Sequence, residues 1–351
     1  TAMKKDRRVE KTVYTLLIVL MLLALPLAVP SGAVLLSAEN AYNDNISLLS
    51  DAIQEEPAAA DAALVVSAGG GSAPEATAAP AALPMDFTAG MLPNPACYTE
   101  DSYQDASITV TMEHREVEGS MCHIAHVKIT DSSQLRTGLA GPFGSNRTNK
   151  TSTLAKNNNA VVAMNGDYYT NNDKGNYLYV ARQGQILRTP SKDKGSLHVL
   201  VVDSHGDFHI LISDKMAQFA AMMADTENPI LQAFTFGPAL VIDGVVQEMP
   251  ESYLFDIRRP NPRSAIGQVG PLEYVMVAVD GRLDDSPGLA LNVLADFMKE
   301  LGCTQAFNLD GGNSSALIFN NAFYSYNKIN SERSTSDIIY FASAVDPASW
   351  Q

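Results

Sequence analysis

Residues 308–315 read Asn-Leu-Asp-Gly-Gly-Asn-Ser-Ser, so a carboxylate, two glycines and two hydroxyls stand close together in the chain. Apolar residues flank the segment at 306–307 and 316–319, which predicts a tight loop between two strands. Glycine tolerates positive φ and lets backbone N–H groups converge on a ligand. The loop is therefore the first candidate for an active centre that binds an anion.

Two further segments place carboxylates directly after apolar strands. Val277-Ala278-Val279 precedes Asp280-Gly281-Arg282, and Ala163-Met164 precedes Asn165-Gly166-Asp167-Tyr168-Tyr169. A helical segment joins the Asp280 turn to the Asp310 turn, which makes a strand–helix–strand unit. If its two strands are parallel, both Asp-Gly turns emerge at the same edge of the sheet, where ligands commonly bind. The Asn, the Asp and the aromatic pair of the other segment could grip a sugar.

These features also have ordinary structural interpretations. Asp-Gly is a common turn dipeptide, and Arg263 at the start of a strand could be a solvated surface cation. His123 and His126 would face opposite sides of one strand, so we assign them no ligand role. Two Asp-Gly turns on either side of one helix are harder to explain as ordinary turns, so we favour a functional site.

From about residue 107 onward, short apolar and alternating runs predict strands. The runs cover 107–112, 124–129, 160–164, 197–202, 208–212 and 274–279. One helix is predicted to begin at Ser286-Pro287 and to end at Gly302, and a second to cover 214–224. Many strands and few helices in mixed order predict an α+β fold, a single mixed, strand-rich domain over residues 97–347.

The first 96 residues divide into two segments. A basic cluster that includes Lys4, Lys5 and Lys11 precedes residues 12–38, which carry no charge. About 20 apolar residues span a bilayer, so residues 1–38 are predicted to be a cleaved signal peptide or an uncleaved membrane anchor. Residues 39–96, rich in Ala, Pro, Gly and Ser, are predicted to form a flexible linker. The domain is then expected on the cell membrane facing outside, or secreted.

The net charge and the cysteines limit which ligands and metal sites the sequence is compatible with. The formal net charge of −15 argues against nucleic acid as a partner and against binding of anionic lipid by the domain itself. An anionic ligand must then be held by a local cluster of cations. The three cysteines show no zinc-type spacing, and Cys97 and Cys122 could either pair or remain thiols.

Several segments, in order, resemble the phosphodiester glycosidase family. They are 235–241, 261–267, 279–282, 308–315 and 330–333, with 165–169 as an upstream segment, and the likeness covers about residues 160–343. Several motifs in the correct order are more specific than any one alone. Two positions depart from the family pattern, because Asn313 replaces the third glycine of the loop and Asp167 stands where glycine is common. Asn tolerates left-handed backbone, so the loop shape can survive.

The resemblance implies a hydrolase that cleaves sugar-1-phosphodiester bonds on the sugar side, in cell-wall, capsule or exopolysaccharide glycans. A phosphodiester is a competent leaving group, so such a site needs cations on the phosphate more than a strong acid. The catalytic candidates are Asp280 and Asp310, as nucleophile or base, and Arg263, as a fork for the phosphate. The predicted substrate-binding residues are Asn165, Asp167, Arg282, Asn308, Gly311, Gly312, Ser314, Ser315 and Arg333. No cofactor is required, although the aspartates could hold a divalent cation.

Two alternatives from other classes stay open. The domain could bind an anionic cell-surface glycopolymer without turnover, in which case replacing Asp310 with Asn would leave its function intact. The Asp-Gly turns could instead hold calcium for structural reasons, in which case chelation would lower the melting temperature and no ester would be cleaved.

Overall fold

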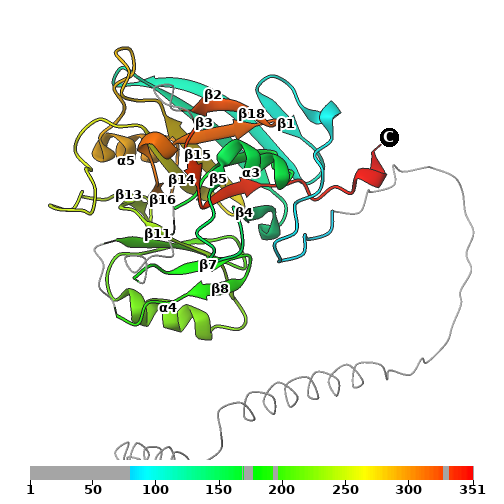
Figure 1. Cartoon of the computed structure of the whole chain (residues 1–351), viewed down its shortest axis with the longest axis horizontal. Coiled ribbons are helices and arrows are strands. Elements are labelled where there is room, and N and C mark those ends of the chain that lie inside the picture. The colour runs from blue at the N-terminus through cyan, green and yellow to red at the C-terminus, as the bar shows by residue number, and fades with distance from the viewer. Residues whose placement is uncertain (1–79, 168, 170–176, 193–196, 327–331, 351) are drawn as a thin grey trace, which may run out of the picture. The chain divides into compact units, whose positions relative to one another are not determined.

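The computed structural model describes residues 80–167, 169, 177–192, 197–326 and 332–350, and Figure 1 shows how their elements are arranged. They belong to a compact unit of residues 76–351. The predicted signal or anchor segment, residues 1–38, lies outside the described residues, as does most of the predicted linker. Every helix in the described ranges is too short or too polar to span a bilayer.

The described residues form four sheets, whose strands are named below in their spatial order. The first has eight strands: β1 (Ser102–Gln104), β2 (Ile108–Val117), β3 (Ser120–Ile129), β15 (Glu273–Val279), β14 (Arg263–Gly270), β16 (Gln305–Leu309), β12 (Ala239–Ile242) and β13 (Val245–Val246). The second has β10 (Phe208–Leu211), β9 (His198–Asp203), β11 (Ile230–Phe236), β7 (Val180–Arg182) and β8 (Gln185–Arg188). The third has β18 (Ala322–Tyr326), β17 (Ala316–Phe319), β6 (Val162–Asn165), β20 (Asp337–Phe341) and β4 (Leu135–Leu139), and the fourth pairs β19 (Ser334–Thr335) with β5 (Asn149–Lys150).

Three α-helices accompany these sheets in the described ranges: α3 (Thr151–Asn157), α4 (Lys215–Ala224) and α5 (Leu291–Glu300). Short 3-10 turns occupy Pro95–Cys97 (η1), Ser132–Gln134 (η2), Gly312–Ser314 (η4) and Pro347–Ser349 (η5). The prediction of a strand-rich α+β fold with few helices is confirmed. The six predicted strand regions all contain strands, and the helix predicted at 214–224 is α4.

The helix predicted from Ser286 begins later, at Leu291. Ser286 does not cap it, because its Oγ accepts the N–H of Met121 at 3.1 Å. Gly288 has a φ of +100°, which lies outside the helical region and delays the first turn. The cap motif is present in the sequence, but a contact with a distant strand uses its hydroxyl.

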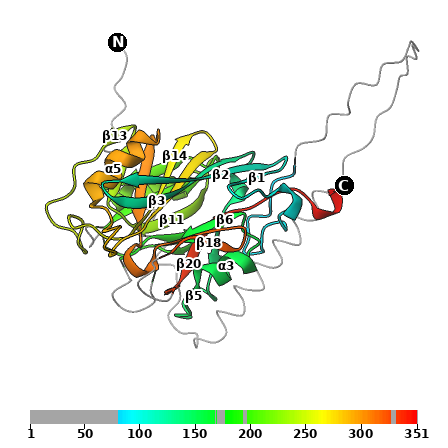
Figure 2. The ribbon, with the colours of Figure 1, turned by 90° about the horizontal axis from the view of Figure 1, so that it is seen from above.

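The central strands β15 and β16 of the first sheet are buried on both faces, and their side chains alternate between two clusters. In β15, Tyr274 and Met276 pack into a cluster shared with the second and third sheets, whereas Val275 and Val277 pack into a cluster shared with α5. We call these sides of the sheet the inner face and the α5 face. Figure 2 shows α5 beside this sheet and α3 beside β20.

The predicted strand–helix–strand unit is β15–α5–β16, with one strand between its two strands. Strand β14 pairs antiparallel with β15 and also with β16. The two outer strands therefore run parallel, as the prediction required. The turn at Asp280 and the turn at Asp310 consequently leave the sheet at the same edge.

Residues 80–96 fall within the predicted linker, yet they are bound to the domain. The fully buried Arg136 donates 3.0 Å hydrogen bonds to the carbonyls of Pro84, Asp86 and Thr88, and Leu83 is buried. Backbone carbonyls supply most of this attachment, and every residue has a carbonyl, so the composition of the segment could not reveal it.

All three cysteines are free thiols. Cys122 and Cys303 are buried in the α5-face cluster, while Cys97 packs against the inner-face cluster. The alternative of a Cys97–Cys122 pair is thus not realised, because the two side chains lie on opposite faces of the first sheet.

Candidate active site

The Asp310 turn lines a pocket of about 360 Å³. Six of the predicted site residues line it: Arg263, Arg282, Asn308, Asp310, Gly311 and Gly312. The other lining residues are Phe236, Leu254, Phe255, Asp256, Asn261 and Leu309. Six of the twelve site residues predicted from the sequence therefore line one pocket.

Strand register explains why these side chains meet. Ala265 of β14 lies opposite Asn308 of β16, and Ala265 packs on the α5 face. Alternation places Arg263 on the same face as Ala265, and Asp310 on the same face as Asn308. The α5 face is thus apolar along its length and becomes polar at the edge where the pocket opens.

Asp280 leaves the same edge but on the inner face. Its carboxylate is buried, lies 3.1 Å from His123 Nε2 and accepts a 2.9 Å hydrogen bond from the Ser325 hydroxyl. His123 Nδ1 in turn lies 2.8 Å from Nδ1 of His114. The structure therefore does not bring Asp280 and Asp310 together, and the pocket lining does not include Asp280. Strand alternation in β15 and β16 is enough to place the two carboxylates on opposite faces of the sheet.

Asp310 carries the most perturbed carboxyl group of the pocket. Burial raises its pKa to about 6, the Asp167 charge adds to this, and the Ser314 hydroxyl, the Arg333 charge and the Gly311 N–H act against it. Asp310 Oδ2 and Ser314 Oγ are both buried and lack a well-aligned hydrogen-bond partner among the described residues. A carboxylate in this state can exchange a proton near neutral pH.

Arg263 offers less to a ligand than a complete fork. Its Nε donates to the Leu289 carbonyl at 2.9 Å, and its Nη2 donates to the carbonyls of Asp256 and Arg259 at 3.1 and 2.9 Å. Only Nη1 makes no hydrogen bond to the described residues. Burial lowers the pKa of Arg263 to about 10, which still leaves it protonated at neutral pH. For the predicted bidentate contact with phosphate, only the Nη1 group of Arg263 is left.

Arg282 is held over the turn by two amides. Its Nε and Nη2 donate to Asn261 Oδ1 at 3.2 and 3.1 Å, and its Nη1 donates to Asn313 Oδ1 at 2.8 Å. These acceptors are neutral, so the guanidinium keeps its full charge beside the pocket. Asn313, which departs from the family pattern, thus acquires a role, because its amide orients this arginine.

Gly311 and Gly312 make close contacts with the backbone at the start of β14 rather than forming an open anion site. The Gly312 N–H donates to the Pro262 carbonyl at 2.8 Å, so it is not available for the predicted anion cradle. A Cβ on Gly311 would lie 2.7 Å from the same carbonyl and 3.2 Å from Arg263 Cα. Gly311 is therefore required because the chain of the Asp310 turn lies directly against the start of β14.

Asn165 and Ser315 support the pocket from the inner face. Asn165 Nδ2 donates to the Asp310 carbonyl at 2.5 Å, and its Oδ1 accepts the Ser264 hydroxyl at 2.9 Å. The Ser315 hydroxyl donates to the Arg263 carbonyl at 2.8 Å. Neither residue lines the pocket, so both position the main chain of residues that do.

Asp167 and Arg333 also lie outside the lining. Asp167 is buried and accepts a 2.7 Å hydrogen bond from Arg182 and a 2.8 Å bond from the Thr235 N–H. Arg182 also donates to Asp337 at 2.9 Å, so two buried carboxylates share one buried cation. Arg333 is exposed and acts on Asp310 through its charge. The predicted contact of these two residues with substrate has no counterpart in the pocket lining.

An aromatic wall was not assigned from the sequence. The rings of Phe236 and Phe255 stack with centroids 4.7 Å apart and an interplanar angle of 27°, and Leu254 beside them is 66% exposed. Phe236 stands in a segment that resembles the family, but Phe255 and Leu254 lie in an irregular loop. No periodicity in that loop pointed to a role in the site.

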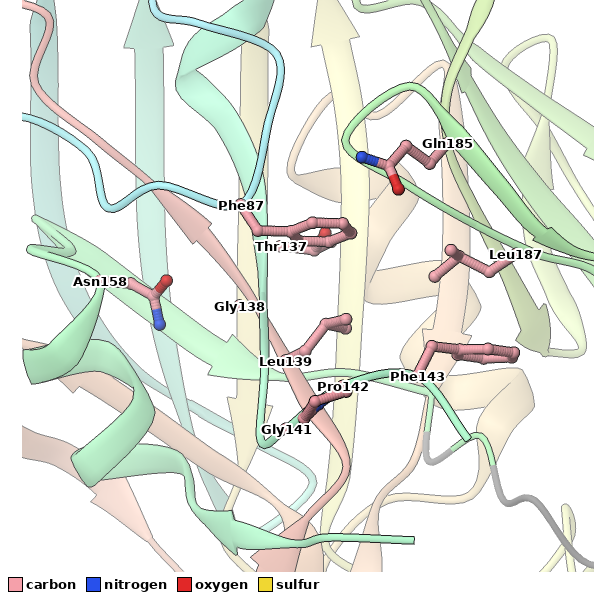
Figure 3. A pocket seen from close by; sticks show the side chains of 10 residues that line it. All are labelled: Phe87, Thr137, Gly138, Leu139, Gly141, Pro142, Phe143, Asn158, Gln185 and Leu187. Carbon is pink, nitrogen blue, oxygen red and sulfur yellow. The ribbon is translucent and has the colours of Figure 1, made fainter. Parts of the chain in front are cut away.

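A second pocket, of about 350 Å³, lacks the groups for this chemistry. Figure 3 shows Phe87, Leu139, Phe143 and Leu187 around it, and its described lining contains no ionisable side chain. No three His, Cys, Asp or Glu side chains of the described residues gather closely enough to hold a metal ion. The pocket at Asp310, which two arginines and two carboxylates line, is the candidate active site.

Solved structures and a curated relative resemble the chain. The catalytic domain of zebrafish N-acetylglucosamine-1-phosphodiester α-N-acetylglucosaminidase, auto-inhibited by its pro-peptide, aligns with a TM-score of 0.53 and 18% identity over 72% of this chain and 87% of that chain. A hypothetical protein from Synechocystis aligns with a TM-score of 0.44 and 16% identity, over 67% of this chain and 62% of that one. The SPbeta prophage-derived uncharacterized protein YomE of Bacillus subtilis (strain 168) is 36% identical over 83 residues, which are 24% of this chain but 13% of that protein. The zebrafish domain shows a shared fold.

A family model decides the relationship. The model of the phosphodiester glycosidase family matches residues 158–342, more than half of the chain. The match contains every lining residue of the pocket at Asp310. The resemblance inferred from the motifs is confirmed, and the chain belongs to the phosphodiester glycosidase family.

Proposed function

We propose that this protein hydrolyses a sugar-1-phosphodiester between the anomeric carbon and the phosphate oxygen, releasing a sugar and a phosphomonoester. Membership of the family supports a glycosidase-type hydrolase. One observation carries the finer assignment. A single pocket holds two guanidinium groups, whose hydrogen bonds to the described residues go to neutral oxygens, beside a buried carboxyl group with a raised pKa.

The two arginines would bind the phosphodiester. Arg263 offers Nη1, and Arg282 offers a charge that its amide partners do not neutralise. Charge-assisted hydrogen bonds to phosphate oxygens are about twice as strong as neutral ones. As the bond to the sugar breaks, negative charge collects on the departing phosphate, so the same contacts strengthen toward the transition state. This supply of positive charge is why we propose that no cofactor is required.

Asp310 would act at the anomeric carbon in its ionised form, as base or nucleophile. A second carboxylic acid is not needed to protonate the leaving group, because a phosphomonoester departs unprotonated. The remaining carboxylate of the lining, Asp256, has its pKa lowered by the N–H groups of Arg259 and Arg258, so it stays ionised and holds its own loop. Above pH 6, the pocket then contains an ionised Asp310 opposite two cations.

The test is hydrolysis of defined diesters by the purified protein. N-acetylglucosamine-1-phosphate methyl ester and glucose-1-phosphate methyl ester would be incubated with it, and ³¹P and ¹H NMR would detect methyl phosphate and free sugar. Equimolar release of both products by the wild type, and release about a hundredfold or more slower by Asp310→Asn, is expected. Binding without products, unchanged in Asp310→Asn, would favour the glycopolymer-binding alternative instead.

We propose further that the enzyme acts outside the cytoplasm, on phosphodiester-linked glycans of the cell surface, and that its N-terminal segment contacts the membrane. The support is the basic cluster followed by the uncharged residues 12–38. Protease added to intact protoplasts should remove the domain. Complete protection of the domain would contradict this location.

A further inference from the structure

Asn308 has a hydrogen-bond acceptor for which the described residues supply no donor. Its Nδ2 donates to the Gly237 carbonyl at 2.6 Å. A carbonyl can only accept, so this contact identifies which end of the amide is nitrogen. The other end, Oδ1, is buried and has no hydrogen-bond partner among the described residues. Asn308 is 1% exposed and lines the pocket at Asp310.

An unpaired buried acceptor normally costs stability, about 1–3 kcal/mol, so its place in the molecule is informative. Asn308 lies two residues before Asp310 on the same face of the strand, which corresponds to about 7 Å between their Cα atoms. Asp310 Oδ2 is also unpaired among the described residues. Two acceptors on neighbouring positions of one face therefore line the same pocket as the cations Arg263 and Arg282.

These two kinds of group, acceptors and cations, match the two halves of the proposed substrate. A phosphodiester carries acceptors only and suits the arginines. A sugar ring carries O–H or N–H donors beside its anomeric carbon and suits Asn308. Resting on the proposed function, we propose that Asn308 determines specificity, because its Oδ1 accepts a hydrogen bond from a hydroxyl or acetamido N–H on the sugar carbon next to the anomeric carbon or on the carbon after it.

The experiment combines substrate analogues with a variant of the full-length protein. Methyl phosphodiesters of glucose, 2-deoxyglucose and 3-deoxyglucose would be hydrolysed by the wild type and by Asn308→Ala. Deoxygenation at carbon 2 changes the intrinsic reactivity of the sugar, but this effect is common to both proteins and cancels in the comparison. The informative quantity is therefore the ratio of kcat/KM for glucose to kcat/KM for each deoxy sugar, wild type against variant.

Gln305 on the same strand supplies a matched control. Its amide nitrogen donates to Asp243 at 2.7 Å, and its Oε1 is likewise buried and unpaired among the described residues, yet it does not line the pocket. Gln305→Ala removes an equivalent amide from β16 without touching the substrate. It should keep the wild-type ratios for all three sugars.

For one of the deoxy sugars, the ratio should be about tenfold or more smaller in Asn308→Ala than in the wild type. Equal ratios in the two proteins for both analogues would overturn the role of Asn308, as would a ratio that falls equally in Gln305→Ala. If Asn308→Ala does not fold, the free sugars glucose, 2-deoxyglucose and 3-deoxyglucose would be compared as competitive inhibitors of the wild type, because inhibition constants do not depend on reactivity at the anomeric carbon. Equal inhibition constants for the three sugars would still overturn the role of Asn308. Failure of the wild type to hydrolyse any diester would refute the proposed function itself.

Discussion

Replacing Arg263 with Lys should separate what this residue does for the loop from what it does for the phosphate. The side chain donates three hydrogen bonds, to the carbonyls of Leu289, Asp256 and Arg259. These carbonyls lie around a planar fork, which the compact ammonium of lysine cannot reproduce. Lysine keeps the charge, so any loss reports geometry.

The magnitude follows from those three bonds. A hydrogen bond from a charged donor contributes about 1.5–3 kcal/mol, and lysine can remake one of the three. Asp256 and Arg259 are exposed, so water can satisfy part of what is lost there, whereas Leu289 is 1% exposed. We therefore expect Arg263→Lys to lower the free energy of unfolding by about 2–4 kcal/mol, a fall of about 5–15 °C in Tm.

Thermal unfolding by circular dichroism and steady-state kinetics would be measured together. The exposed Arg258, in the same loop, donates to the Glu251 carbonyl at 2.9 Å, and Arg258→Lys should change stability by less than about 0.5 kcal/mol. In Arg263→Lys, kcat/KM should fall more for a sugar-1-phosphodiester than for an aryl glycoside of the same sugar, which has no phosphate. An unchanged Tm would refute the anchoring role. Equal losses on both substrates would mean that Arg263 does not contact phosphate.

The remaining predictions concern the Asp310 turn and the buried ion cluster. Asp310→Asn should lower kcat by about a hundredfold or more with little change in KM, and unchanged turnover would reject its catalytic role. Because burial raises the pKa of Asp310 to about 6 and the ionised form is the reactive one, kcat/KM should rise as pH increases through about 6; a profile that falls there would assign Asp310 as an acid. Gly311→Ala places a Cβ 2.7 Å from the Pro262 carbonyl, so activity and Tm should both fall, and retention of both would show that the turn can move. Arg182→Leu strands two buried carboxylates and should cost about 3–5 kcal/mol in urea unfolding, whereas a loss below about 1 kcal/mol would show that they take up protons cheaply.

The sequence predicted the elements that depend on local pattern. Apolar alternation located strands such as β15 and β3, and the turn residues located the loop at Asp310. The strand–helix–strand unit also implied that Asp280 and Asp310 would share an edge, which the antiparallel β14 between them makes true. Which face each carboxylate occupies was not deduced, although it follows from strand alternation once the partners of β15 and β16 are known.

What could not be predicted depends on contacts between segments distant in the chain. Arg263 was expected to bind phosphate with a complete fork, but carbonyls of Asp256, Arg259 and Leu289 occupy most of it. Carbonyls carry no sequence signal, since every residue has one. The hydrogen bonds from Arg136 to residues 84–88 also end on backbone carbonyls, so the sequence could not predict them. Motifs therefore identify which residue types reach a site, whereas the donors and acceptors left for a ligand depend on the contacts that the fold makes. In the part of the chain that the structure describes, the groups left in this pocket are Nη1 of Arg263, the charge of Arg282 and the unpaired oxygens of Asn308 and Asp310.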